Sequence, residues 1–529
     1  MAYDLLIRGG AVHDGSGASP VEADVAIADG RIVAVGRPSD RAETVVEAGG
    51  LAVAPGFIDI HSHSDYTLLV DPRAVSAVMQ GVTLEVIGNC GFGCGPIADP
   101  RLSAGSIYGC DGTVPLTWAS MGGYLERLRQ ARPAINVMTL MPNAQLRIAA
   151  LGVADRAATA SEIATMRDLL REGLSEGAIG LSVGLEYPAE KAASGEELTV
   201  LAREAGRAGG FFATHTRDRA AGAVAAVEEA IRIARTAEVK LQVSHLIPRS
   251  GEAASFRCVE AVEAARACGQ DIAFDMHTRL YGTTMLSTLL PSWALTDGVA
   301  ALRSRLADPD SRAAMKSVTT IISSVRDWDR VVLLDLPGRP DVSRLSLGEI
   351  GRGRGRDPHD CALDILADEA ETLNRPMVIL LVHTEREQRL AFAHPLCVPG
   401  SDATTLAPDG ALADKTFHGA YTWAAWFWRA MVRDWGLLTP EAAVHKLTGL
   451  PASILGLSDR GAIRVGARAD LAVFDTQAFG ERGTTFEPNQ TAAGMQHVIV
   501  NGVLTLRDGA LTGARAGEVL RRRGTPMTM

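Results

Sequence analysis

Residues 211–246 read FFATHTRDRAAGAVAAVEEAIRIARTAEVKLQVSHL, and this stretch decides the fold class. Two β-rich segments, 211–215 and 239–246, flank residues 220–237, in which apolar side chains recur at helical spacing. A strand, a helix and a second strand of this kind form a βαβ unit, whose two strands lie parallel and whose crossover is right-handed. The stretch therefore predicts an α/β protein with a parallel sheet.

The same alternation continues along the chain. A helix over 258–269 and a strand over 271–276 follow directly, and further strands are predicted at 56–61, 82–88, 135–141, 178–184 and 395–402. Repeated units of this number favour a (β/α)8 TIM-type barrel, with an open doubly wound sheet as the alternative. Residues from about 285 to 375 fit the alternation poorly, and we interpret them as an insertion, either a lid or a decoration.

The two chain ends have a different pattern. EADVAIADGRIVAVG (22–36) places Asp29-Gly30 between two β-rich runs, and HVIVNGVLTLRDG (497–509) places Asn501-Gly502 in the same way. Both dipeptides are typical of tight hairpin turns. Neither end has enough strands for a stable core, so we expect the two ends to pair in one small β domain.

Composition excludes several classes of protein. Among 529 residues, 52 are Lys or Arg and 62 are Asp or Glu, which gives a net charge of −10 and argues against generic binding to nucleic acid or an anionic membrane. There is no signal-peptide pattern and no apolar run of about 18 residues, so no membrane segment is predicted. Seven cysteines are an odd, sparse set that favours a reducing, cytoplasmic location.

Two histidines follow the first predicted barrel strand. His61 and His63 lie in GFIDIHSHSD (56–65), two positions apart. Side chains two apart on a strand face the same side, so both imidazoles can reach one metal ion. A single HxH pattern is weak support for a metal site.

Four more residues of metal-ligand type end other predicted strands: Cys90, His215, His245 and Asp402. Each alone is explained as well by a structural role, as a small buried thiol, a hydrogen-bonded core histidine or a helix cap. Together with His61 they occupy the carboxyl ends of five strands, where barrel active sites lie, and this pattern predicts a metal site. Thiolate and imidazole ligands favour Zn²⁺, although other late first-row metals also accept them.

Two further histidines fit either a place in the active-site pocket or a place in the hydrophobic core. His277 and His383 also end strand-like runs. Cys94 and Cys110 form no CxxC pair, and the remaining four cysteines, Cys258, Cys268, Cys361 and Cys397, are interpreted as structural.

With these motifs, the sequence resembles the N-acyl-D-amino-acid deacylase (D-aminoacylase) branch of the metal-dependent amidohydrolase superfamily. The matching pieces are GFIDIHSHSD, IGNCG, GLSVGLEYP, ATHTRD, QVSHL, PGSD, KLTGLPASILGL, DRGAIRVGARADLAVFD and HVIVNG, and the resemblance extends from residue 3 to about 525. The resemblance implies a (β/α)8 barrel over 56–459, with the insertion at about 285–375. It also implies a small β-sandwich formed by 1–55 and 460–529.

The resemblance also implies roles for the ligand-type residues. Cys90, His215 and His245 match a tight zinc site, and Cys90 is able to bridge two metals. His61 and His63 match a second, weaker metal position. Asp402 matches the general acid/base.

Lysine content separates this branch from its relatives. Cyclic-amide hydrolases of the superfamily typically bridge two metals with a carboxylated lysine at a strand end. Only five lysines are present, and Lys240 begins its strand, at the end away from His245. A thiolate bridge from Cys90 is the available substitute.

The substrate-binding positions of the branch are altered here. Tyr187 is retained. Ile247 stands where the branch has a lysine two residues after the strand-ending histidine, and Thr416, with Lys415 beside it, is the best match to an arginine of the branch. His277 and Arg279 match two tyrosines of the branch. A buried carboxylate without a partner costs several kcal/mol. Either Arg279, Arg249 or Lys415 therefore anchors a substrate carboxylate, or the substrate lacks one. Our hypothesis is that Arg279 lines the pocket, the alternative being an arginine stacked over the barrel rim.

The sequence thus predicts a zinc-dependent hydrolase of the amide bond in an N-acyl-D-amino acid or a related linear N-acyl amide. The alternatives are a cyclic amide or imide hydrolase or a deaminase on the same barrel, and a barrel that has lost catalysis and serves as a binding protein. The expected partner is a small molecule rather than nucleic acid or a membrane, and homo-oligomerisation is left open.

Overall fold

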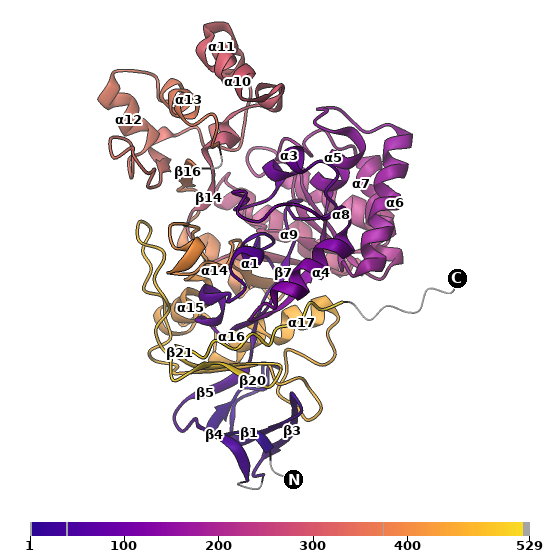
Figure 1. The fold of residues 1–529 in the computed structure, drawn as a ribbon, viewed down its shortest axis with the longest axis vertical. Helices are drawn as coiled ribbons and strands as arrows, with labels where there is room; N and C mark the ends of the chain where they lie inside the picture. Colours follow the sequence, from indigo (N-terminus) through magenta and orange to yellow (C-terminus); the bar gives the residue numbers. More distant parts are fainter. Residues whose placement is uncertain (1–2, 39–40, 374, 522–529) are drawn as a thin grey trace.

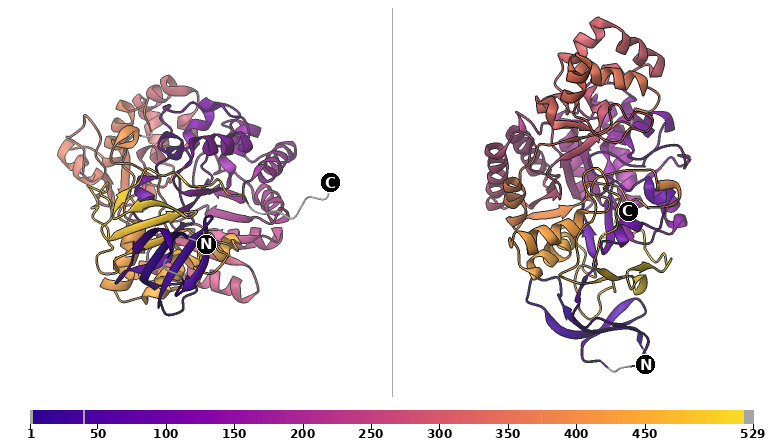
Figure 2. Two further views of the ribbon diagram at one scale, coloured as in Figure 1. Left: turned by 60° about the horizontal axis from the view of Figure 1, so that its bottom comes forward. Right: turned by 90° about the vertical axis from the view of Figure 1, so that its left-hand side faces the viewer.

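The computed structural model describes residues 3–38, 41–373 and 375–521. Three layers follow one another along the longest axis (Figure 1). A sheet from both chain ends lies at the bottom, parallel strands and their helices lie in the middle, and helices α10–α13 lie at the top. Figure 2 shows the same order from the side. The α/β class predicted from the sequence is confirmed.

The middle layer contains two parallel sheets. One has the order β6-β7-β8 and the other the order β17-β13-β12-β11-β10-β9. The strands are β6 (Phe57–Asp59), β7 (Val82–Ile87), β8 (Asn136–Thr139), β9 (Met141–Pro142), β10 (Gly180–Gly184), β11 (Phe211–His215), β12 (Lys240–Val243), β13 (Ile272–His277) and β17 (Cys397–Gly400). Nearly all their residues are buried, as is typical of parallel strands covered on both faces.

The two parallel sheets meet at both of their edges. On one side, β8 and β9 are separated by one residue, Leu140, whose N–H donates to the carbonyl of Ile87 on β7. On the other side, the chain beyond β6 pairs in parallel with the chain beyond β17 through Ser62 and Ala403. Every strand of the two sheets is therefore linked through its neighbours to the next.

Helices follow the strands as the alternation predicted. They are α4 (Met121–Ala131), α5 (Asn143–Leu151), α6 (Ala160–Glu176), α7 (Gly195–Arg207), α8 (Ala223–Ala237), α9 (Glu252–Ala267), α14 (Glu385–Ala393), α15 (Trp423–Trp428), α16 (Pro440–Leu447) and α17 (Gly449–Leu455). The helix predicted over 258–269 begins six residues earlier, at Glu252, and in this added stretch Ser255 is buried, where its hydroxyl donates to Glu387 (2.7 Å). Strand β12 ends at Val243, before the predicted end, because the chain turns at His245 with φ 33°.

Both chain ends enter one nine-stranded sheet, with the order β21-β20-β19-β18-β5-β1-β2-β3 and β4 paired to β1. Its strands are β1 (Tyr3–Val12), β2 (Val21–Ala28), β3 (Arg31–Gly36), β4 (Ala42–Glu47), β5 (Ala52–Pro55), β18 (Leu471–Phe474), β19 (Met495–Val500), β20 (Val503–Arg507) and β21 (Ala510–Leu511). The turns at Asp29-Gly30 and Asn501-Gly502 have positive φ at all four residues, as the predicted hairpins require. The expected pairing of the two ends is confirmed.

The poorly alternating segment has a core of its own. Strands β14 (Gly282–Met285), β16 (Met377–Leu380) and β15 (Val331–Leu333) form an antiparallel sheet. Helices α10 (Gly298–Ala307), α11 (Pro309–Lys316), α12 (Leu347–Arg354) and α13 (Pro358–Asp368) surround a separate hydrophobic cluster. Tyr187, from the loop after β10, packs against this cluster. The insertion is therefore in contact with the middle layer.

A buried polar network joins the end sheet to the middle layer. Asp470, next to β18, accepts hydrogen bonds from Arg460, from the Asn136 side chain on β8 (3.1 Å) and from the backbone N–H of Asn501 (2.7 Å). Arg460 also donates to the Asn501 side chain over 2.8 Å. The side chains of Arg460 and Asp470 are each 5% exposed. Because water barely reaches them, each charge is stabilised mainly by the other.

We expect Asp470→Ala to lower the free energy of unfolding by about 3 kcal/mol or more, because the guanidinium of Arg460 remains buried after its carboxylate partner is removed. The measurement is the shift of the urea unfolding midpoint. Asp168→Ala is the control, since its side chain is 65% exposed and its loss is expected to cost less than about 1 kcal/mol. Equal shifts for the two variants contradict the prediction.

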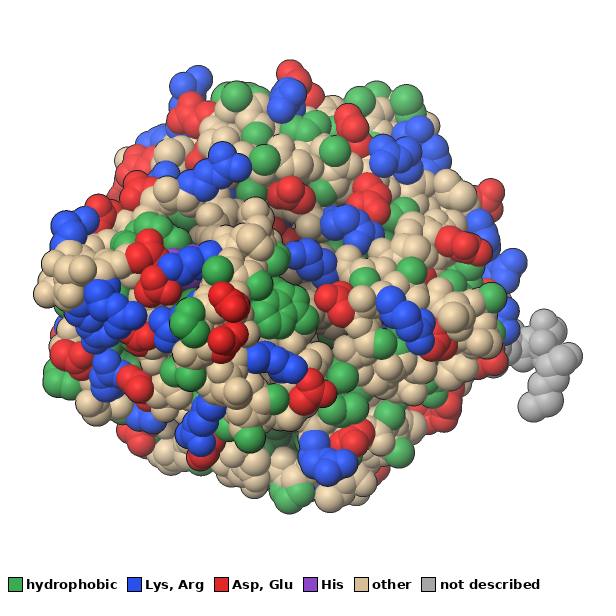
Figure 3. Space-filling view, turned by 90° about the horizontal axis from the view of Figure 1, so that it is seen from above, with side chains coloured by type: hydrophobic (Ala, Val, Ile, Leu, Met, Phe, Trp, Pro, Cys, Tyr) green, Lys and Arg blue, Asp and Glu red, His purple; other side chains and the backbone are tan. Residues whose placement is uncertain are grey.

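Among the described residues, no helix is both long and apolar enough to cross a bilayer. On the face seen from the insertion side, Lys and Arg side chains are interspersed with Asp and Glu (Figure 3).

Candidate metal centre and active site

The residues of metal-ligand type gather beyond the carboxyl ends of the parallel strands. His61 follows β6, Cys90 follows β7, His215 is the last residue of β11, His245 follows β12 and Asp402 follows β17. Parallel strands end at a common edge, so side chains far apart in the sequence converge there. All five are buried or nearly so.

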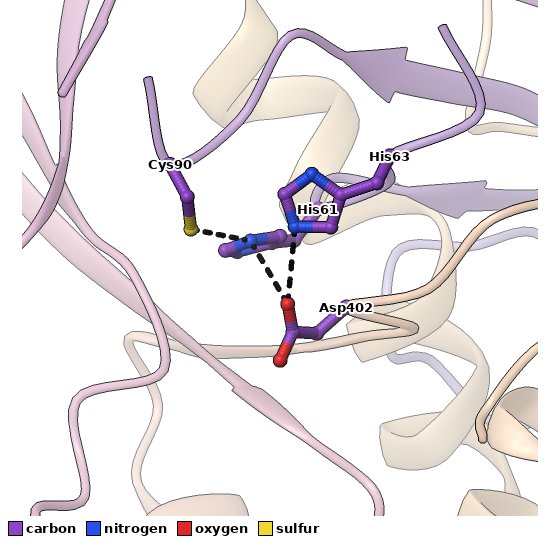
Figure 4. Close-up of side chains that lie close together, drawn as sticks. All are labelled: His61, His63, Cys90 and Asp402. Carbon is purple, nitrogen blue, oxygen red and sulfur yellow. Dashed lines mark hydrogen bonds and ion pairs between the residues drawn. The ribbon is translucent and has the colours of Figure 1, made fainter. Parts of the chain in front are cut away.

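The first group contains His61, His63, Cys90 and Asp402, whose ligand atoms all lie within 4.8 Å of one another (Figure 4). Nε2 of His61 lies 3.2 Å from Sγ of Cys90 and 3.5 Å from Oδ1 of Asp402. Nε2 of His63 lies 3.2 Å from the same carboxylate oxygen. The two imidazoles predicted to share one face thus converge on Asp402.

The second group contains Cys90, His215 and His245, again within 4.8 Å. Sγ of Cys90 lies 3.4 Å from Nε2 of His245, and Nδ1 of His215 is buried without a hydrogen-bond partner among the described residues. Cys90 belongs to both groups. One thiol and two imidazoles form a donor set of the kind that Zn²⁺ accepts, and a position between the groups suits a shared ligand.

Two carboxylates that the sequence analysis missed orient these histidines. Asp275 on β13 accepts from Nδ1 of His61 (2.9 Å), which leaves Nε2 of that ring toward Cys90. Glu186 accepts from Nε2 of His215 (2.7 Å), which leaves Nδ1 free. Carboxylates behind histidines in this way fix the tautomer of metal-binding imidazoles.

These two carboxylates are themselves held in place. Asp275 also accepts from the Gln242 side chain (2.9 Å) and from the backbone N–H of His245 (2.8 Å). Glu186 accepts from Nη2 of Arg249 (2.5 Å). Burial alone favours a neutral carboxyl, but Arg249 and His215 hold the pKa of Glu186 well below its ordinary value. A signal was available, because Asp275 lies two residues before His277 on one strand and therefore on the same side.

Asp402 is an ionised carboxylate in a buried setting. Burial opposes its charge, yet the hydrogen bond with His63 and the nearby charges of His61, His245 and Arg279 hold its pKa well below the ordinary value. Asp402 has φ 46°, and its N–H donates to the carbonyl of His61. The carboxylate is therefore held at the edge of the first group.

Arg279 lies behind Asp402. Its guanidinium donates to the carbonyls of Ser401 (2.7 Å) and His418 (2.6 Å), and Nη2 lies 3.4 Å from Oδ2 of Asp402. A narrow cavity beside the ligand groups is lined by Asp402, and Arg279 is not among its lining residues. The structure therefore places Arg279 in support of Asp402.

The other predicted substrate residues are placed differently from one another. Tyr187 and His277 line the cavity. Ile247 is fully buried and presents its carbonyl oxygen to Arg219. Thr416 is exposed, and Lys415 forms an ion pair with Asp111 (2.9 Å).

The cavity has walls from distant parts of the chain. Tyr108, Tyr187 and Phe417 supply aromatic surface, and Arg219 and Arg249 supply positive charge. The insertion contributes Ile321, strand β16 contributes Leu380, and the segment after β16 contributes Val382 and His383. Among these, only Tyr187, Arg249 and His383 were candidates in the sequence, because no motif marks the others.

Comparison with known proteins agrees with this geometry. The model of the amidohydrolase family matches residues 44–310 and 397–506. A D-aminoacylase of Alcaligenes xylosoxydans xylosoxydans is 32% identical over 535 residues, which cover 98% of each chain. A solved D-aminoacylase, described with a binuclear metal centre, has a TM-score of 0.81 and 32% identity over 98% of this chain and 100% of that one.

A further solved relative holds a metal and an inhibitor. The N-acyl-D-glutamate deacylase of Bordetella bronchiseptica, in complex with zinc and a phosphonate that mimics the tetrahedral intermediate, has a TM-score of 0.79. Its identity is 30% over 98% of this chain and 100% of that one. The chain therefore belongs to the amidohydrolase family, within its D-aminoacylase branch.

Proposed function

We propose that this protein is a zinc-dependent amidohydrolase that cleaves the amide bond of an N-acyl-D-amino acid or a related linear N-acyl amide. The observation that carries the proposal is the thiol of Cys90, which is shared between two ligand groups, one of which includes Asp402. Relatives with the same overall fold bear names of this activity.

The proposed architecture is a closed barrel. The parallel sheets, joined at Leu140 and at the bridge between Ser62 and Ala403, together supply strands for a (β/α)8 barrel over 56–459. The insertion at about 285–375 interrupts this barrel, and residues 1–55 and 460–529 form the two parts of a β-sandwich.

The proposed metal ligands follow from the two groups. Cys90, His215 and His245 would hold one zinc ion tightly. His61 and His63, with Cys90 as a bridge and Asp402 nearby, would hold a second ion more weakly. The chemistry that bound zinc supplies is Lewis-acid polarisation of the amide carbonyl and a lowered pKa for a water molecule.

The residues of the chain carry the proton transfers. Asp402 begins ionised and accepts the proton of the attacking water. It then donates this proton to the leaving nitrogen, because an amine leaves poorly unless it is protonated. His63 and Arg279 hold the two carboxylate oxygens in position during both steps. Asp275 and Glu186 keep the facing imidazoles in one tautomer.

Lysine placement speaks against a cyclic-amide hydrolase with a lysine bridge. Lys240 lies at the opposite end of β12, where it donates to the carbonyl of Ile454. No described lysine is among the residues that line the cavity.

The test combines metal analysis with a substrate screen. We expect the purified protein to contain zinc and to hydrolyse N-acetyl-D-amino acids faster than their L-enantiomers and faster than hydantoin or dihydropyrimidine rings. Dialysis against a chelator is expected to abolish turnover, and added zinc to restore it. Preference for a cyclic amide, or full activity of the metal-free protein, overturns the proposal.

A further inference from the structure

One wall of the cavity carries a buried positive charge that the proposed chemistry does not use. Arg219 lines the cavity and is 8% exposed. Its Nη2 donates to two backbone carbonyls, those of His245 (2.7 Å) and Ile247 (2.8 Å), and its Nε is buried with no partner in the described part of the chain. No described carboxylate forms an ion pair with it.

The neighbouring arginines already have carboxylate partners. Both terminal nitrogens of Arg249 donate to Glu186, over 3.1 and 2.5 Å. Arg279 is directed to Asp402 and to backbone carbonyls. Arg219 is thus the cavity-lining cation that a bound anion would compensate most, because a buried charge without a counter-charge is costly.

The wall near Arg219 also contains neutral polar groups. The rings of His277 and His383 lie 5.2 Å apart, and both have Nδ1 buried without a partner among the described residues. Oγ1 of Thr284, another lining residue, is in the same state. Burial, with the charges of the surrounding arginines, lowers the pKa of both imidazoles well below its usual value, so they stay neutral. They can donate to a ligand or accept from it without adding charge.

We propose that Arg219 is a specificity-determining residue that binds a carboxylate on the amine half of the substrate. This inference rests on the proposed function. Asp402 and Arg219 both line the cavity, so a molecule whose amide lies at Asp402 can place its carboxylate at Arg219. The guanidinium matches a carboxylate in shape and charge.

The test compares substrates that differ in charge. N-acetyl-D-methionine carries an α-carboxylate, N-acetyl-D-methioninamide carries none, and N-acetyl-D-isoglutamine carries only a side-chain carboxylate. We expect Arg219→Gln to lower kcat/KM about 30-fold or more for the acid that the wild type prefers, mainly through KM. Its kcat/KM for the neutral amide should change by less than about threefold. The preferred acid shows which carboxylate Arg219 binds.

Two further variants serve as controls. Arg219→Lys retains a cation and should regain part of the preference for the acid. Arg266→Gln, in an exposed ion pair, should behave as the wild type. Zinc content and thermal midpoint are measured for each, because Arg219 also holds two carbonyls next to a proposed ligand. If Arg219→Gln fails to fold or loses zinc, Arg219→Lys and the wild-type preference decide the outcome.

A binding measurement, which does not require turnover, tests this inference separately from the proposed function. Calorimetric titration of the zinc-loaded protein with the free amine half of the preferred acid, D-methionine or D-isoglutamine, should show binding that Arg219→Gln weakens about 30-fold or more. Equal loss on acid and amide, or unchanged binding of that amine in the variant, overturns the role of Arg219 and leaves the proposed function intact. Failure of the wild type to cleave any of the three substrates counts against the proposed function instead.

Discussion

Asp402→Asn is expected to lower kcat by about 10²–10⁴-fold, the range for loss of a general acid/base. The amide keeps the size of the carboxylate but cannot accept the proton of water or pass it to the leaving nitrogen. One zinc ion should remain, because Cys90, His215 and His245 form a ligand group without Asp402. Steady-state kinetics and metal analysis of the same preparation measure both effects.

Asp409→Asn is the matched control for this experiment. Asp409 lies on the same segment, is 67% exposed at its side chain and pairs with Arg73. We expect its kcat to equal that of the wild type. A wild-type kcat for Asp402→Asn removes Asp402 from the proton transfers, and loss of all zinc from that variant shows that its carboxylate is needed to hold the tight site.

Cys90→Ala is expected to remove bound zinc and to reduce hydrolysis to the background of the assay. The thiol is the one residue that both ligand groups share, so its loss affects both proposed metal positions. Its replacement by a methyl group leaves His245 and His61 facing a gap without a donor. Zinc content measured after dialysis, together with activity before and after addition of zinc, tests this expectation.

The neighbouring Cys94 provides the control. It is equally buried, at 1% exposed, but belongs to neither ligand group. Cys94→Ala should keep its zinc and its turnover, with at most a modest loss of stability from the smaller side chain. A zinc content in Cys90→Ala equal to that in Cys94→Ala contradicts the shared-ligand assignment.

Much of the fold was predictable because local patterns and the fold agree. The hairpins at Asp29-Gly30 and Asn501-Gly502 require positive φ, which these residues tolerate, and both form as expected. The pairing of the chain ends followed from their shortage of strands. Element ends were less predictable. The early start of α9 at Glu252 and the early end of β12 at Val243 depend on how the chain packs after each turn.

The candidate ligands were visible in the sequence because each one ends a strand. Their partners were missed, since Glu186 and Asp275 act through contacts with His215 and His61 from separate parts of the chain. Only Asp275 had a signal in the sequence, its position two residues before His277 on one strand. For Arg279 the sequence suggested a contact that the structure does not show. The sequence suggested a place in the pocket for it, and the structure places it behind Asp402.

The sequence by itself determined the α/β class, the pairing of the two chain ends and the residue types at the strand ends. These features depend on periodicity and turn chemistry, which act over a few neighbouring residues. The tertiary structure alone decided which cations are already paired. Arg249 meets Glu186 whereas Arg219 meets only backbone carbonyls. That difference depends on distances between side chains from separate loops, and local sequence does not encode such distances.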